Sequence, residues 1–129
     1  MLDTNIVSDL MRNPSGPAAI RLAAHGPARV GLSIFTAAEL TFGAQKAKSP
    51  KFAERVTAIL ARFPILPFAS PGEEHYGAIR AFLSARGTPI GPNDLWIAAH
   101  ALTLGVTLIT HNLTEFQRVP GLAVESWLD

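Results

Sequence analysis

The hydrophobic positions are most continuous over residues 95–104, where apolar side chains occur on nearly every face of a helical repeat. This pattern predicts a helix that is almost entirely buried. The helix is expected to begin near Asp94, with Asn93 as its N-cap, and to end at Gly105. Residues 106–109 follow as a short apolar run that favours an interior parallel strand. A helix followed at once by a buried strand is half of a βαβ unit.

Segments with helical or strand-like spacing alternate along the rest of the chain. We expect a first strand of at most two residues, strands at 29–33, 65–68 and 122–127, and helices at 8–11, 18–24, 36–44, 52–63, 73–85 and within 110–116. This order predicts an α/β fold of three layers, with a mainly parallel central sheet of about five short strands. The length of 129 residues predicts a single domain over 1–129.

Composition narrows the class of protein. Hydrophobic residues make up 48% of the sequence and charged residues 16%, which argues against disorder. The sequence has neither the run of ~18 apolar residues that a membrane span needs nor a basic leader, so we expect no membrane segment and no signal peptide. The absence of cysteine excludes disulfides and thiolate metal sites, and it permits the cytoplasmic location that we expect. Because the net charge is only +1, a nucleic-acid partner would have to be held by a local patch.

Carboxylates are expected to gather at one edge of the sheet. In a parallel sheet the segments that follow the strands emerge at the same edge, and here they carry Asp3, Glu39, Asn112 and Glu115. Asp94 opens the helix that leads into the fourth strand. Crowded carboxylates repel one another unless a cation lies between them, and oxygen ligands without cysteine favour Mg²⁺ or Mn²⁺. Such a cation suits the hydrolysis of phosphodiester bonds.

Several of these residues also have a structural interpretation. Asp94 would complement the dipole of its own helix, and the Asp-Thr-Asn at 3–5 would form a plain turn. Thr36 and Glu39 fit the capping-box pattern, which would give Glu39 a structural role. The local sequence leaves both interpretations open.

Basic and histidine side chains provide further candidates. Lys46, Lys48 and Lys51 lie close together in the sequence, where they form either a solvated helix end or a contact to a phosphate backbone. His111 lies near the acids and is a second candidate for a phosphate contact. His100 lies on the apolar helix and is expected to be a core or interface residue, not a ligand.

Four motifs are distinctive. They are Met-Leu-Asp-Thr-Asn-Ile-Val-Ser-Asp-Leu at 1–10, Thr-Ala-Ala-Glu-Leu at 36–40, Ile-Gly-Pro-Asn-Asp-Leu-Trp-Ile-Ala-Ala-His-Ala at 90–101 and Leu-Ile-Thr-His-Asn-Leu-Thr-Glu-Phe at 108–116. In order and spacing they resemble the PIN-domain family, and specifically the VapC toxins of bacterial VapBC toxin–antitoxin pairs. The resemblance covers essentially the whole chain. It implies a PIN-like fold and a Mg²⁺- or Mn²⁺-dependent endoribonuclease.

The resemblance also implies roles for the acids. The three principal family acids fall on Asp3, Glu39 and Asp94, and the last family position falls on Asn112, with Glu115 three residues later. Asp3 and Asp94 would be the main ligands of the cation. Glu39 would bind it through water or act as a general base, and Asn112 and Glu115 would complete the site. Because Asn112 carries no charge, the number of cations, one or two, stays open.

Supporting roles follow from the same resemblance. In similar proteins the threonine after the first aspartate orients that aspartate, a role that Thr4 would take here. Asn5 and Asn93 would contact the ligating side chains and not the cation itself. Only two residues precede Asp3, fewer than the family normally has, so either the first strand is very short or the given chain starts late.

The partners implied by the resemblance are RNA, a second copy of the chain and an antitoxin. The RNA would be structured, such as tRNA, and would reach the acids along the grooves of a homodimer. A VapB-like antitoxin would block the groove. A larger toxin–antitoxin assembly would bind DNA through the antitoxin. The alternative is a PIN-like module that binds RNA or a partner protein without cleaving, which the uncharged Asn112 keeps open.

Overall fold

A computed structural model describes residues 1–128 of the chain. Its four regular strands are β1 (Leu32–Ser33), β2 (Ile65–Leu66), β3 (Leu108–Ile109) and β4 (Val124–Glu125). β1 pairs with β2 and β3 pairs with β4, both in parallel. Leu2 joins the two pairs because it forms parallel bridges to Leu32 on one side and to Ile109 on the other. The sheet therefore has the order β2-β1-Leu2-β3-β4, which confirms the expected parallel sheet of about five short strands.

The backbone around Leu2 places Asp3 at the carboxyl edge of the sheet. The Leu2 amide donates to the Gly31 carbonyl at 3.2 Å, and the Asp3 amide donates to the Ile109 carbonyl at 2.9 Å. Leu2 itself is fully buried. From Leu2 at the centre of the sheet, the chain adds β1 and β2 on one side and then β3 and β4 on the other. The point where the strand order reverses is the topological switch point, where open α/β sheets bind ligands. Asp3 lies at this point.

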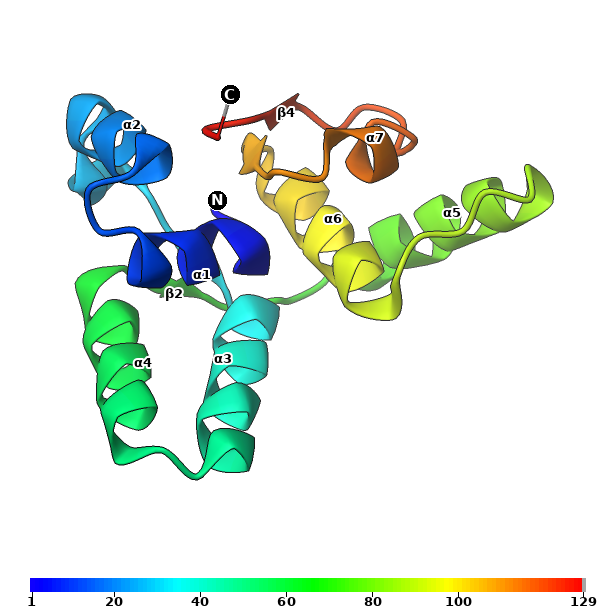
Figure 1. The fold of residues 1–129 in the computed structure, drawn as a ribbon. Coiled ribbons are helices and arrows are strands. Elements are labelled where there is room, and N and C mark those ends of the chain that lie inside the picture. Colours follow the sequence, from blue (N-terminus) through cyan, green and yellow to red (C-terminus); the bar gives the residue numbers. More distant parts are fainter. Residues whose placement is uncertain (129) are drawn as a thin grey trace.

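Helices cover both faces of this sheet. In chain order they are α1 (Thr4–Arg12), α2 (Pro17–His25), the 3₁₀ helix η1 (Pro27–Arg29), α3 (Ile34–Ala47), α4 (Pro50–Arg62), α5 (Gly72–Ala85), α6 (Pro92–Leu104) and α7 (Leu113–Phe116). One buried cluster includes Ile6, Leu22 and Val56, and another includes Ile97 and Phe116. Figure 1 shows the α3–α4 hairpin and the α5–α6 pair as two arms that extend in different directions. No helix within residues 1–128 is long and apolar enough to cross a membrane.

Four of the expected helix starts are displaced by two residues or more. One of these is α4, which begins at Pro50 and not at residue 52 because Ser49 is its N-cap. α1 begins at Thr4 and not at Ser8, because the Asp3 side chain accepts from the Ile6 amide at 2.9 Å and caps the helix. α3 begins two residues before Thr36, since Ser33 is its N-cap, so Thr36 and Glu39 form no capping box.

The fourth correction concerns Asn93, which is not the N-cap of α6. The helix begins at Pro92, whose fixed φ suits the first helical position, and Gly91 precedes it as the N-cap. The expected strands are also longer than the observed ones. Residue 29 belongs to η1, and an extended linker follows it before β1. In each of the later expected strands, only two residues belong to the regular strand. The residues of β1 and β3 are buried, whereas Ile65 of β2 and Glu125 of β4 are exposed at the two edges of the sheet.

His100 is a core residue, as expected, and it joins three segments. Its Nδ1 lies 2.8 Å from the Ser33 hydroxyl and its Nε2 lies 3.0 Å from the Pro67 carbonyl oxygen. A carbonyl only accepts, so Nε2 carries the proton and Nδ1 accepts from Ser33. Burial lowers the pKa of His100, against the opposing effect of the Pro67 hydrogen bond. The folded protein therefore holds this imidazole neutral.

This burial predicts a pH-dependent contribution to stability. The unfolded imidazole takes up a proton near its ordinary pKa of 6.5, whereas the folded one resists protonation. The contribution of His100 to the unfolding free energy is therefore fully present above pH 6.5, and it declines as the pH falls toward the lowered pKa. We expect the difference in unfolding free energy between the wild type and His100→Gln to shrink from pH 7.5 to pH 5, measured by urea denaturation. Parallel pH profiles for the two proteins would contradict this assignment.

Candidate active site

Asp3 is the most constrained acid of the chain. It is only 2% exposed, and both of its carboxylate oxygens accept hydrogen bonds. Oδ1 accepts from the Ile6 amide at 2.9 Å, at the N-terminus of α1, and Oδ2 accepts from the Thr110 hydroxyl at 2.6 Å. The helix N-terminus and the hydroxyl both favour the charged carboxylate in this buried position.

Thr110 links Asp3 to the turn that follows β3. Its Oγ1 donates to Asp3 and accepts from the Asn112 amide at 2.9 Å. Thr110 is completely buried, so its hydroxyl is shielded from solvent. No role for Thr110 was predicted from the sequence. A threonine at the carboxyl end of the fourth strand was a usable signal, because that is the edge where the acids were expected.

Thr4 orients Glu39, not Asp3. Its hydroxyl donates to Glu39 Oε1 at 2.8 Å and lies 3.3 Å from the hydroxyl of Thr36. The expected hydrogen bond from Thr4 to Asp3 is not formed, because α1 turns the Thr4 side chain toward α3. Glu39 is half-buried and is held in place from the first turn of α1.

Glu115 connects α7 to the start of α6. Its Oε1 accepts from the Gly91 amide at 3.0 Å, and its Oε2 accepts from the side-chain amide of Asn112. The Gly91 amide would otherwise lack a partner at the N-terminus of α6. Glu115 therefore fixes the segment that carries Asp94, and the Asn112 side chain is engaged with Glu115.

Asp94 lies in the first turn of α6, within the electric field of the other three acids. Its pKa is raised to about 6, first by burial and then by repulsion from Glu115, Asp3 and Glu39. The pKa of Asp3 is also raised, mainly by burial, although its hydrogen bonds to Thr110 and Ile6 and the charge of His111 oppose the shift. The structure thus gathers the four acids that the sequence indicated.

The chemistry of this donor set fits a hard divalent cation. The candidate ligands are carboxylates and one amide, all with oxygen donors, and a cation would relieve the repulsion that raises the pKa of Asp94. The geometry is less complete. Within residues 1–128, no group of three or more His, Asp or Glu side chains is arranged to hold a metal ion. The carboxylates influence one another without forming a finished coordination site.

The remaining candidates lie at the margin of the site or away from it. Asn5 and Asn93 are exposed, and the described residues give them no side-chain hydrogen bond to an acid. His111 is exposed beside Asn112, and its charge lowers the pKa of Asp3. The three lysines are exposed around the end of α3, where the Lys46 ammonium lies 5.9 Å from the Phe42 ring. Lys46 is seven residues beyond Glu39, or ~10 Å along the helix.

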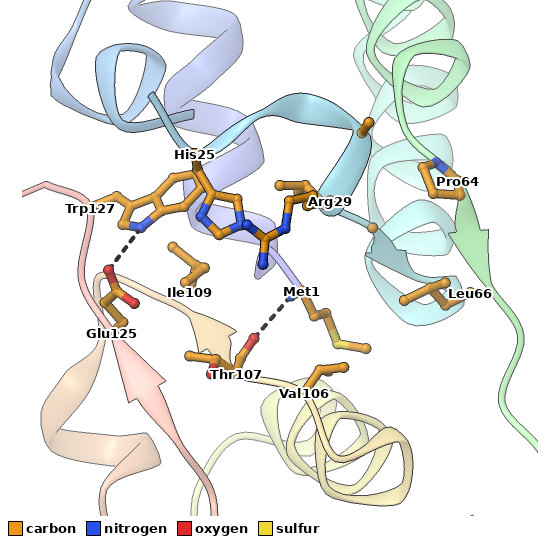
Figure 2. Close-up of a pocket in the computed structure, with 13 residues that line it drawn as sticks. Met1, His25, Arg29, Pro64, Leu66, Val106, Thr107, Ile109, Glu125 and Trp127 are labelled. Atoms are coloured by element: carbon orange, nitrogen blue, oxygen red, sulfur yellow. Dashed lines mark hydrogen bonds between the residues drawn. The ribbon is translucent and has the colours of Figure 1, made fainter. Parts of the chain in front are cut away.

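A separate cavity of about 470 Å³ lies at the opposite edge of the sheet. Figure 2 shows His25, Arg29 and Trp127 around it, together with the hydrogen bond from the Met1 amino group to the Thr107 carbonyl at 2.9 Å. None of the four acids lines this cavity. The chemistry of the acids is therefore confined to the carboxyl edge of the strands.

The raised pKa of Asp94 predicts that this acid destabilises the metal-free protein. The native state binds its proton more tightly than the unfolded state, whose pKa is near 3.8, so the cost is present above pH 6 and vanishes below pH 3.8. We expect Asp94→Asn to raise the unfolding free energy at pH 8 by about 1–2 kcal/mol, a value reduced for the partial exposure of this carboxyl. The gain should disappear near pH 4. Urea denaturation in the presence of a chelator measures it, and Glu54→Gln on the exposed face of α4 is the control.

Thr110 offers a second test, because its hydroxyl serves two partners. Thr110→Val leaves Asp3 Oδ2 and the Asn112 amide without that partner and should cost about 1–3 kcal/mol of stability. Thr110→Ser keeps the hydroxyl and should recover most of the loss. The pKa of Asp3, followed by carboxyl NMR, should rise in the valine variant only. Equal behaviour of the two variants would show that the hydroxyl is not what holds Asp3.

Comparisons with known proteins show the family of this chain. The family model described as PIN domain matches residues 1–122. The chain is 38% identical over 132 residues to the tRNA(fMet)-specific endonuclease VapC of Salmonella typhimurium, an alignment that covers 98% of this chain and 96% of that protein. It is 41% identical over 131 residues to ribonuclease VapC1 of Haemophilus influenzae strain R2866, with the same two coverages.

A solved structure gives the same result in three dimensions. VapBC2 from Rickettsia felis, bound to a DNA fragment from its promoter, contains a chain that superposes with a TM-score of 0.91 at 32% identity. The match covers 98% of this chain and 97% of that one. The family match, the identities and the shared fold all extend over the segments that carry Asp3, Glu39 and Asp94. The chain belongs to the PIN-domain family and is a relative of the VapC proteins.

Proposed function

We propose that this protein is a Mg²⁺- or Mn²⁺-dependent endoribonuclease, the toxin of a type II toxin–antitoxin pair. The observation that carries the proposal is the gathering of Asp3, Glu39, Asp94 and Glu115 at the switch point of the sheet, where the other three acids raise the pKa of Asp94. The names of the relatives support it, since they are ribonucleases and a tRNA endonuclease. The substrate class that we propose is structured RNA such as tRNA.

Asp3 and Asp94 would hold the cation directly and Glu39 through a water molecule, with Asn112 and Glu115 beside them. When bound, such a cation supplies charge neutralisation at the phosphate and lowers the pKa of a water molecule. The chain supplies the positioning. Thr110 and the α1 N-terminus hold Asp3, and Glu115 holds the first turn of α6 that carries Asp94.

Glu39 is suited to accept a proton from the attacking water. Its Oε1 is fixed by the Thr4 hydroxyl, and its half-buried position leaves the carboxylate accessible from the site. The hydrogen bond at one oxygen fixes the direction of the other, and a positioned carboxylate within reach of the water can take its proton. We therefore assign the general base to Glu39 and its orientation to Thr4.

The solved relatives support an antitoxin partner. The R. felis structure is a VapBC assembly on promoter DNA, so we propose a VapB-like antitoxin and a DNA-bound complex of both proteins for this chain. We also propose a homodimer, which the resemblance to VapC toxins implies. The antitoxin would cover the acids and block access of RNA. We expect the protein to act in the cytoplasm, where its RNA substrate is found.

One observation favours a second candidate function. Within residues 1–128 no metal-binding cluster of three side chains is formed, and the uncharged Asn112 is engaged with Glu115. A module that binds RNA or a partner protein without cleaving would have these properties. A cleavage assay separates the two functions.

The test is cleavage of total RNA and bulk tRNA by protein freed of any antitoxin, with Mg²⁺, with Mn²⁺ and with a chelator. We expect discrete fragments that disappear with the chelator and fall at least ~100-fold in Asp94→Asn, because that variant loses a charged ligand. Glu54→Gln, which removes an exposed acid on α4, should cleave like the wild type.

The opposite result is equally informative. If RNA binds but no metal supports cleavage, the protein is a binding module and Asn112 is the residue to examine. If cleavage continues in the chelator, the proposed cation is wrong and the carboxylates act without it.

A further inference from the structure

Three arginines surround the loop that connects α5 to α6. Arg80 lies on α5, Arg86 follows its last turn, and Arg118 follows α7. Arg86 and Arg118 line the same shallow hollow of about 530 Å³, together with Phe82 and Thr88, although they are 32 residues apart in the sequence. The fold thus brings positive charge from two separate segments to one place.

Within residues 1–128, no carboxylate forms an ion pair with these three arginines. The ion pair in that range joins Arg21 and Glu125, two other residues. The partners of the three guanidinium groups are uncharged. The Arg80 Nη1 donates to the Tyr76 hydroxyl at 3.0 Å, the Arg86 guanidinium lies 4.7 Å from the Phe82 ring, and the Arg118 Nη1 donates to the Pro89 carbonyl at 3.4 Å. These partners position the guanidinium groups and leave their charge available to an anionic ligand.

A cavity of about 280 Å³ opens beside the arginines, between α5 and the start of α6. Its lining includes Tyr76, Arg80, Ser84, Pro89, Pro92 and Leu95. The volume is near the lower limit of small-ligand pockets, about 300 Å³, which suits one flat ring system. The Tyr76 ring stacks on Trp96 with centroids 3.8 Å apart, and the Arg80 guanidinium lies over the Tyr76 ring, 5.9 Å from its centroid, so Tyr76 and Arg80 form one wall of fixed orientation.

The cavity adjoins the acids through the first turn of α6. Pro92 and Leu95 line it, and Asp94 lies between them in the sequence, in the first turn of the same helix. Gly91, the residue before Pro92, is itself bonded to Glu115. The cavity and Asp94 therefore share the first turn of α6.

We propose that this surface binds the RNA substrate next to the bond that is cut, a proposal that rests on the function proposed above. The cavity takes one unstacked nucleobase, with Tyr76 as its aromatic wall and Arg80 and Ser84 as its polar contacts. Arg86 and Arg118 contact the phosphates of the same strand. Proteins recognise unpaired RNA by stacking splayed bases on aromatic and guanidinium groups, and the near-neutral net charge of this chain requires a local basic patch for such binding.

The first test measures binding and does not require cleavage. Bulk tRNA is titrated against Asp94→Asn protein and against the same protein carrying Arg86→Gln and Arg118→Gln, at several salt concentrations. We expect about tenfold weaker binding, and a slope of log Kd against log salt that is smaller by about 1.4 for two lost phosphate contacts. The control carries Arg55→Gln and Arg62→Gln on α4, where Arg62 lies 5.4 Å from the Phe63 ring much as Arg86 lies over Phe82.

The second test fills the cavity in otherwise wild-type protein. Ser84→Trp places a large ring in the space proposed for the base, and we expect a higher KM and a changed nucleotide preference at the cut ends. Ala78→Trp adds the same ring to an exposed position of α5 that does not line the cavity and should leave both unchanged. Thermal unfolding of each variant shows whether it folds.

The outcomes separate this inference from the function on which it rests. If wild-type protein does not cleave RNA, the proposed function fails. The binding test alone then shows whether this surface binds RNA. If the arginine variants bind tRNA as the control does, with the same salt slope, the surface is not an RNA site. If they keep RNA binding but lose a co-expressed antitoxin, the surface belongs to a protein partner and the inference is overturned.

Discussion

The hydrogen bond between Thr110 and Asp3 joins the ends of the two central strands of the sheet. Asp3 follows Leu2, the bridge between the two halves of the sheet, and Thr110 follows β3. The same carboxylate caps α1, so one side chain sets the start of a helix and links the ends of two strands. A change at either partner therefore affects the fold and the site together.

The fold offsets the repulsion among its acids with helix N-termini. Asp3 caps α1, Asp94 lies in the first turn of α6, and Glu115 accepts from the amide of Gly91 at the start of that same helix. The partial positive charge of a helix N-terminus stabilises a nearby carboxylate. This compensation is incomplete, because the pKa of Asp94 is still raised to about 6. The residual repulsion is what a bound cation would relieve.

Two groups of basic side chains were candidates for contacts to RNA. The lysines at the end of α3 were visible in the sequence because they are neighbours there. The arginines around the α5–α6 loop were not, since Arg86 and Arg118 meet only after α7 folds back beside that loop. Of the two patches, the second is continuous with the residues that hold Asp94, through Pro89, Gly91 and Glu115.

The order of strands and helices, the buried character of α6 and His100, and the four acids at one edge could all be predicted from the sequence, because periodicity and the position of acids after strands are local properties. The ends of the strands and the starts of α1, α3 and α6 could not. The Asp3 and Ser33 side chains compete successfully for the first amides of α1 and α3, and the fixed φ of Pro92 sets the start of α6. That Thr4 orients Glu39 and that Thr110 holds Asp3 became visible only in the folded chain. These partners are 35 and 107 residues apart, and packing alone brings them within reach of a hydrogen bond.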